Sequence, residues 1–105
     1  MLSGADFAAV LKSRERSRAA HFSLHWRAGA APVSRLGLVV SKKFARTSVR
    51  RNLIKRQTRM LFTGWQRGSS AILDVVLKLN VNAVALDRRV QYGELAGLVE
   101  RLPRA

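Results

Sequence analysis

The chain has 105 residues, 48% of them hydrophobic, and no cysteine, which allows one folded core and excludes disulfides and thiolate zinc sites. Its 20 Lys and Arg against 6 Asp and Glu give a formal net charge of +14, which favours phosphate-rich partners. No stretch is apolar enough to span a membrane or to serve as a signal peptide, so we expect a single domain over residues 1–105 with a cytoplasmic location.

The first predicted element is a short helix from about residue 4 to residue 13. Ser3 can cap it, and Phe7 and Val10 recur at helical spacing on one face. The basic segment 12–20 that follows lacks apolar periodicity. It indicates a loop or the irregular start of a strand.

Residues 21–27 alternate between apolar and polar side chains, which predicts a strand with one buried and one polar face. Its two histidines, His21 and His25, would lie about 13 Å apart at about 3.3 Å per residue, too far to share a metal ion. We therefore expect no metal site. The polar face is either a nucleic-acid-binding surface, on which an imidazole can stack against a base, or a row of solvent-facing side chains.

Residues 29–34 contain Gly29 and Pro32 and predict the turn of a hairpin, with residues 35–41 as its second strand. Gly37 leaves one face of that strand bare, so a backbone or a ligand could approach there.

Residues 71–79 form a nearly continuous apolar and β-branched run, which is typical of a central strand covered on both faces. Asp74, the one acid in the middle of the chain, is expected to pair with a basic neighbour rather than to hold a metal.

Residues 80–89 show no deciding periodicity and are interpreted as a connection. Leu95, Leu98 and Val99 then predict a last amphipathic helix over residues 92–102, stopped by Pro103. The order of helix, strands, helix, strand, helix indicates an α+β fold with helices packed on a small sheet.

The segment 41–59, SKKFARTSVRRNLIKRQTR, carries eight Lys or Arg and no acid. We expect a helix from about Ser48, capped by Thr47 or Ser48 itself, that ends between residues 66 and 68. Arg51, Lys55 and Arg59 recur every four residues and would form a basic stripe, with Asn52 and Arg56 beside it. The expected apolar arc on the opposite side consists of Val49, Leu53, Ile54, Met60, Leu61 and Trp65.

Solvated helix faces usually mix the two signs of charge, so a stripe of one sign favours a polyanion, and nucleic acid first of all. A basic helix lying on an anionic membrane is an alternative, but the strands around it need covering, which favours a core function for the apolar arc.

We find no set of side chains that could perform catalysis. The six carboxylates are scattered, without a close pair for acid–base work or for magnesium. Ser23 and His25 lie in a plain strand without a strained turn, and no glycine-rich phosphate loop lies between a strand and a helix. These observations indicate a binding protein.

The segment GLVVSKKFARTSVRRNLIKRQTRMLF resembles the signature of the bacterial ribonuclease P protein subunit family, in which a strand ending in Ser/Ala-Lys-Lys leads into a helix bearing Arg-Asn-Arg-x-x-Lys-Arg-x-x-Arg-Glu. The matching residues are Ser41, Lys42, Lys43, Arg51, Asn52, Ile54, Lys55, Arg56, Thr58 and Arg59. Asp6-Phe7, the aromatic strand at Phe22 and Asp74-Val75-Val76 extend the resemblance over nearly the whole chain.

The sequence departs from the family pattern at several places. Leu53 stands where the family usually has the second Arg of Arg-Asn-Arg, and Met60 stands where it usually has Glu. Leu11 and His25 lie where relatives often have aromatic residues, and the basic arm that commonly precedes the first helix is missing.

The resemblance implies a four-stranded sheet with helices packed on it and a left-handed crossover, of the ribosomal protein S5 domain 2-like type. It also implies a partnership with a catalytic RNA subunit, which would hold most of the magnesium cofactor and cleave the 5′ leader from precursor tRNA, with no catalytic residue in this chain. A ribosomal or general RNA-binding scaffold is the alternative function.

Carried over residue by residue, the resemblance assigns two sets of side chains. The catalytic RNA would be contacted by Lys42, Lys43, Arg46, Arg50, Arg51, Asn52, Lys55, Arg56 and Arg59. The leader would lie in a cleft between the first helix and the sheet, lined by Phe7 and His25 and also by Ser23 and Arg27. Phe7 can equally be a plain core residue.

Overall fold

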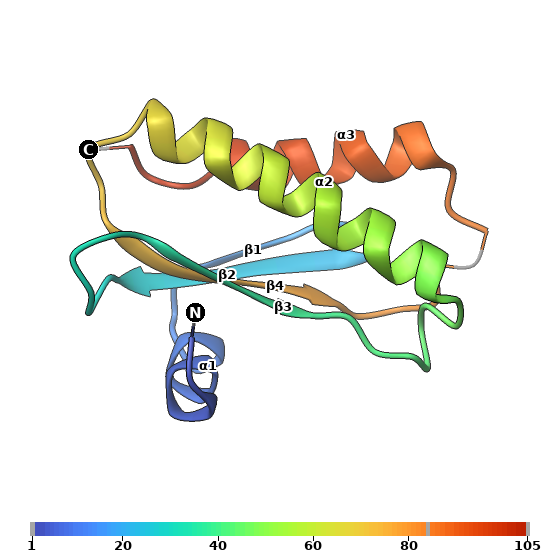
Figure 1. Cartoon of the computed structure of the whole chain (residues 1–105), viewed down its shortest axis with the longest axis horizontal. Coiled ribbons are helices and arrows are strands. Elements are labelled where there is room, and N and C mark those ends of the chain that lie inside the picture. The colour runs from blue at the N-terminus through green and yellow to red at the C-terminus, as the bar shows by residue number, and fades with distance from the viewer. Residues whose placement is uncertain (1, 84, 105) are drawn as a thin grey trace.

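The computed structural model describes residues 2–83 and 85–104. Three helices and four strands follow the predicted order, and Figure 1 shows α2 and α3 on one face of the sheet with α1 on the other. The elements are α1 (Gly4–Leu11), β1 (Arg16–Arg18), β2 (Phe22–Ala28), β3 (Arg35–Val39), α2 (Ser48–Arg67), β4 (Leu73–Leu79) and α3 (Arg88–Glu100). The α+β prediction is confirmed.

The four strands form one mixed sheet in the order β1-β2-β4-β3. β4 is antiparallel to β2 and parallel to β3, so it separates the two strands that the sequence predicted to pair. The predicted hairpin across residues 29–34 is therefore wrong. The central position of β4 follows from its composition, since a strand that is apolar on both faces is best covered when it has a neighbour on each edge.

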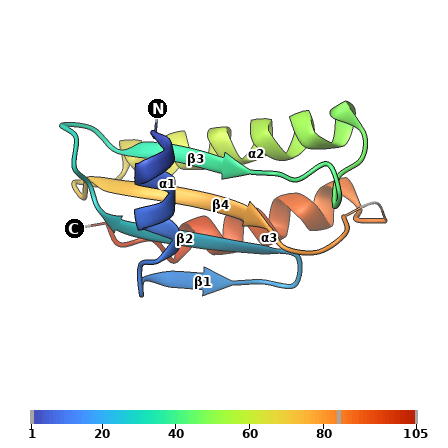
Figure 2. The same ribbon diagram turned by 90° about the horizontal axis from the view of Figure 1, so that it is seen from below.

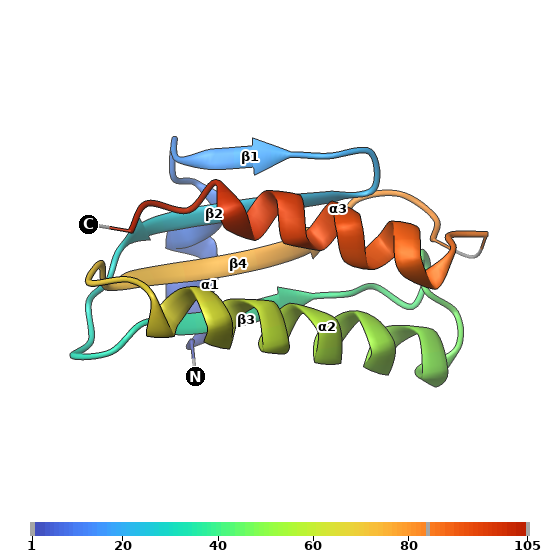
Figure 3. The same cartoon turned by 90° about the horizontal axis from the view of Figure 1, so that it is seen from above.

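The connection from β3 through α2 to β4 is left-handed, as Figure 3 shows with α2 in front of the sheet and as the opposite view in Figure 2 confirms. Crossovers between parallel strands are right-handed in about 98% of cases, so this hand is a specific feature of the fold. The left-handed crossover that the family resemblance implied is confirmed, and it places α2 over β3 and beside α3.

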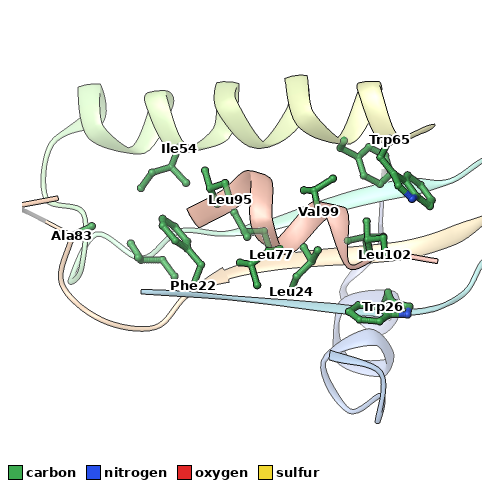
Figure 4. Packing of buried hydrophobic residues seen from close by; sticks show 14 of the residues in the cluster. Phe22, Leu24, Trp26, Ile54, Trp65, Leu77, Ala83, Leu95, Val99 and Leu102 are labelled. Atoms are coloured by element: carbon green, nitrogen blue, oxygen red, sulfur yellow. The ribbon is translucent and has the colours of Figure 1, made fainter. Parts of the chain in front are cut away.

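The main core lies between the sheet and the two helices α2 and α3 (Figure 4). Phe22 and Leu24 of β2 point towards the helices, and Trp26 belongs to the same buried cluster, as their alternate spacing predicted. The last apolar residues of α3 close the other side of this core.

Helix α2 has the predicted bounds. The Thr47 side chain accepts a hydrogen bond from the backbone nitrogen of Arg50 at 3.1 Å, and the helix ends at Gly68. Its predicted apolar arc is partly wrong, because Val49 is 78% exposed and Met60 is 57% exposed.

Two polar residues of α2, Gln57 and Thr58, occupy the buried stripe instead. Both have partners that satisfy them there. Thr58 Oγ1 donates to the Ile54 carbonyl at 2.8 Å, and Gln57 Oε1 accepts from Gln91 Nε2 at 2.7 Å.

On the opposite face of the sheet, Ser3 caps α1, as predicted, and forms a reciprocal capping box with Asp6. Its Phe7 ring covers Gly37, where an added Cβ would lie only 2.5 Å from the ring. The bare face of β3 therefore receives a side chain of this same protein.

The polar face of β2 is also covered. Ser23 is 3% exposed and His25 is 7% exposed, so the prediction of a solvent-facing row is wrong for these two residues. β1 pairs with β2 along residues 16–18, a segment for which the sequence allowed either a loop or the start of a strand.

Helix α3 begins four residues before its predicted start, because Asp87 caps it by accepting from the backbone nitrogens of Arg89 and Val90.

Candidate nucleic-acid interface

The outward side of α2 carries three exposed polar side chains at successive turns, Asn52, Arg56 and Arg59. The turn between β3 and α2 adds the exposed side chains of Lys42, Lys43 and Arg46. This turn is held by backbone hydrogen bonds from Phe44 and Ala45 to the Ser41 carbonyl, and the burial of Ala45 anchors it to the core. We call these six residues the α2 basic face.

Arg50 and Arg51, also predicted to contact RNA, are partly engaged within the protein. Arg50 Nη1 donates to Gln91 Oε1 of α3 at 3.0 Å. Arg51 Nη1 donates to the carbonyls of Ala45 and Arg46 at 2.9 and 3.0 Å and is half-buried. Arg51 is therefore only partly free for RNA, because its guanidinium group fastens the turn to the helix.

Within residues 2–83 and 85–104, every ion pair involves only His21, Arg27 or Arg35 as the cation. The cations of the α2 basic face are thus not neutralised by carboxylates of the described chain. A polyanion that reaches this face would meet unpaired positive charges and would reduce their mutual repulsion.

Lys55 lies at the edge of the same helix and is half-buried. With Arg59 and Phe62 it borders a hollow of about 510 Å³ that runs along the outer edge of β3 to Phe7 of α1. Phe7 packs on Gly37 and also lines this hollow, and its contact with the leader stays a prediction.

A second hollow of about 320 Å³ lies under the β1–β2 pair. Ser23 and His25 line it together with Arg16 and Arg18. The only sequence signal that could have predicted these two arginines as site residues is the alternation of Arg, Ser and Arg, which is typical of a strand. Ser23 Oγ lies 2.8 Å from Nε2 of His25 and accepts from Asn80 Nδ2 at 2.9 Å.

The other ring nitrogen of His25, Nδ1, is buried and has no hydrogen-bond partner in the described part of the chain. Burial lowers the pKa of His25 below its ordinary value, and the positive charges of Arg16, Lys78 and Arg18 lower it further. Arg16 and Arg18 make the hollow positively charged, which suits it to an anionic ligand.

Arg27 does not share this hollow. Its guanidinium lies 3.1 Å from Asp6 and 3.2 Å from Asp74, beside Arg35, which also contacts both carboxylates. Hydrogen bonds from Arg35 are the main reason that the pKa of Asp74 is below its ordinary value. The predicted pairing of Asp74 with a basic neighbour is confirmed, and the four predicted cleft residues lie in three separate places.

Among the residues described, no three His, Asp or Glu side chains come together as a metal site. No helix in the described ranges combines the length and hydrophobicity that a bilayer crossing requires.

Comparisons with known proteins give one consistent result. The family profile for Ribonuclease P matches residues 1–103. The chain is 40% identical over 101 residues to the ribonuclease P protein component of Ralstonia pickettii, covering 90% of this chain and 72% of that protein. It is 34% identical over 99 residues to the corresponding protein of an Azoarcus species, covering 94% and 82%.

Two solved structures are similar over almost their whole length. The RNase P protein of Thermotoga maritima has a TM-score of 0.73 and 25% identity, with 93% of this chain and 92% of that chain covered. The RNase P protein of Staphylococcus aureus has a TM-score of 0.80 and 23% identity, with 95% and 91% covered, and it supports the fold.

Proposed function

This chain belongs to the ribonuclease P protein family, and from that premise we propose that it is a single RNA-binding domain that serves as the protein subunit of ribonuclease P. In this function it binds the catalytic RNA and the 5′ leader of precursor tRNA. It supports the magnesium-dependent removal of that leader by the RNA.

The observation that carries this proposal is the α2 basic face, whose cations have no carboxylate partner in the described chain. A folded RNA offers closely spaced phosphates at the scale of a helix face, and each phosphate contact releases condensed counterions. Asn52 adds a side chain that can both donate and accept hydrogen bonds in the middle of the positive charges.

The leader is proposed to pass the opposite face of the sheet, where His25 and Ser23 line a hollow with Arg16 and Arg18. The two exposed arginines can hold phosphates of the passing strand. Phe7 lies at the other side of α1, where it can stack against a base.

Magnesium is assigned mainly to the RNA subunit. The carboxylates of Asp6 and Asp74 are held by two arginines, so a magnesium ion at these residues would have to displace guanidinium groups. The residues of this chain do not fit a magnesium site there.

Reconstitution tests the proposal. Mixing the protein with a bacterial ribonuclease P RNA should increase cleavage of precursor tRNA at low magnesium concentration, and the product should carry a mature 5′ end. Binding to the RNA without any stimulation would leave only the scaffold function. Binding to anionic liposomes without binding to RNA would favour the membrane-surface alternative.

The matched variants are Arg56→Gln and Arg101→Gln. Both remove one exposed cation, but Arg56 lies on the α2 basic face whereas Arg101 follows the end of α3. Arg56→Gln should reduce the stimulation at limiting protein concentration, and Arg101→Gln should leave it unchanged.

A further inference from the structure

A groove of about 530 Å³ lies between α2 and α3, which run side by side on the sheet (Figure 3). Seven residues line it, namely Leu53, Arg56, Gln57, Met60, Arg88, Arg89 and Tyr92. Its size is within the range of sites that hold small ligands or single groups of larger ones.

The apolar part of this groove is built from the two places where α2 departs from the family signature. Leu53 and Met60 are seven residues apart and therefore lie on the same side of the helix. Where the family usually has an Arg and a Glu, this chain has two uncharged side chains, and Met60 is 57% exposed. Tyr92 of α3, 39% exposed, adds an aromatic ring from the opposite wall.

The rim of the groove is positively charged. Arg56 lies on the α2 side and Arg88 and Arg89 lie on the α3 side, and no acidic residue is among the lining side chains of the described chain. Gln57 is held at the floor because its Oε1 accepts a hydrogen bond from Gln91, which in turn accepts from Arg50. The groove thus has a hydrogen-bonded polar floor at Gln57, apolar walls at Leu53 and Met60, and cations at its rim.

We propose that this groove binds one unstacked nucleotide of the catalytic RNA, with the base against Tyr92, Leu53 and Met60 and the flanking phosphates on the three arginines. An aromatic ring beside arginines is the combination that binds single-stranded nucleotides, because a base stacks on the ring while its backbone stays charged. The inference rests on the proposed function and deepens it, since it names an additional contact with the same RNA.

Two features favour RNA over a protein in this groove. Arg56 belongs both to the α2 basic face and to the groove, so an RNA lying on the face reaches the groove without leaving the protein. A second copy of this chain is disfavoured, because a two-fold contact would bring Arg56, Arg88 and Arg89 of one copy against the same cations of the other. Arg88 and Arg89 also return positive charge to the neighbourhood of Leu53, where the family usually has an Arg.

The test is the affinity of the folded full-length protein for a bacterial ribonuclease P RNA, measured by filter binding at fixed salt. Tyr92→Leu removes the ring but keeps apolar bulk, and it should weaken binding about 5- to 150-fold, the range of one lost base–aromatic stack. Tyr92→Phe should bind like the unmodified protein. Met60→Glu should weaken binding by placing a carboxylate in the groove, whereas Val33→Glu, in the β2–β3 loop, makes the same charge change at an exposed position and should have little effect.

Cross-linking identifies the contact directly. With 4-thiouridine in the RNA, cross-linked peptides should include Tyr92 or Met60, and circular dichroism should confirm that all variants are folded. If the unmodified protein binds the RNA and Tyr92→Leu binds equally well, the groove is not a contact, although the proposed function stands. If the unmodified protein does not bind the RNA, both fail. A dimer in sedimentation that Met60→Glu dissociates would assign the groove to a second copy and overturn the inference.

Discussion

The guanidinium group of Arg35 binds the carboxylate of Asp74 in a bidentate manner, with Nε donating to Oδ1 and Nη2 donating to Oδ2, both at 2.9 Å. Arg35 opens β3 and Asp74 lies in β4, and the two residues are direct partners in the parallel register. The ion pair therefore ties the edge strand to the centre of the sheet at the end where both strands begin. Arg27 of β2 reaches the same carboxylate, so Asp74 joins three strands.

Asp74→Asn should destabilise the protein by about 2 to 4 kcal/mol, because it leaves two arginines beside a neutral group that is 0% exposed. Urea denaturation measures the change. Asp87→Asn is the matched control, since Asn is as good a helix cap as Asp and the site is exposed. Equal effects of the two substitutions would contradict the structural importance of Asp74.

Gly37→Ala should destabilise the protein by about 1 to 3 kcal/mol, because the new methyl group would enter the space of the Phe7 ring. The same substitution should cost clearly less in a Phe7→Ala background, where the ring is gone. A double-mutant cycle of unfolding free energies measures this coupling. Additive effects would show that Phe7 does not lie on Gly37.

Arg56→Gln and Arg51→Gln should separate binding from stability. Arg56 is exposed, so its loss should weaken RNA binding without lowering the melting temperature. Arg51 fastens the turn through two backbone carbonyls, so its loss should lower both. Thermal unfolding and filter binding on the same preparations distinguish the two outcomes, and a large loss of stability for Arg56→Gln would mean that its orientation is misassigned.

The affinity for RNA should depend steeply on salt. If the five cations of the α2 basic face and Lys55 each meet a phosphate, the slope of log K against log salt should be about −4 to −5. Removing one contact with Arg56→Gln should make the slope shallower by slightly less than 1. A slope near −1 for the unmodified protein would contradict the α2 basic face as the binding surface.

Stability should fall between pH 7 and pH 5 because of His25. Its pKa in the folded protein is below the ordinary value of 6.5, so the unfolded chain binds a proton more readily and gains from acidification. The contribution of the neutral ring is present above pH 6.5 and is lost as the pH falls towards the folded pKa. His25→Phe should flatten the dependence of melting temperature on pH, whereas His21→Gln should keep the His25 part of it.

Local signals in the sequence were sufficient for some elements and not for others. The bounds of α2 follow from Thr47 and Gly68, and the central place of β4 follows from its nearly continuous apolar run. The hairpin was mispredicted because a Gly and Pro connection has the same composition whether the next strand lies adjacent or one strand away. That choice depends on β4, which is more than thirty residues later in the chain.

In the candidate site, too, local sequence predicted some features and not those that depend on distant parts of the chain. Periodicity located the basic side of α2, but it ranked Val49 and Met60 as buried because they are apolar, while the structure buries Gln57 through its bond to Gln91 of another helix. The engagement of Arg51 depends on a turn that only the folded chain brings within reach. The groove could not be predicted, since its two walls are far apart in sequence.

The position of β4 between β2 and β3 also determines when this protein can fold during its synthesis. While β4 is still missing, a growing chain holds the β1–β2 pair and β3 with no strand to join them, and it exposes a cationic helix. We therefore expect that the nascent N-terminal two thirds do not fold alone. A fragment ending at Ser70 should accordingly show no cooperative melting. RNA that is present before β4 is synthesised meets a positively charged, unfolded chain. Its phosphates would neutralise the cations of α2 and hold that segment until β4 completes the sheet.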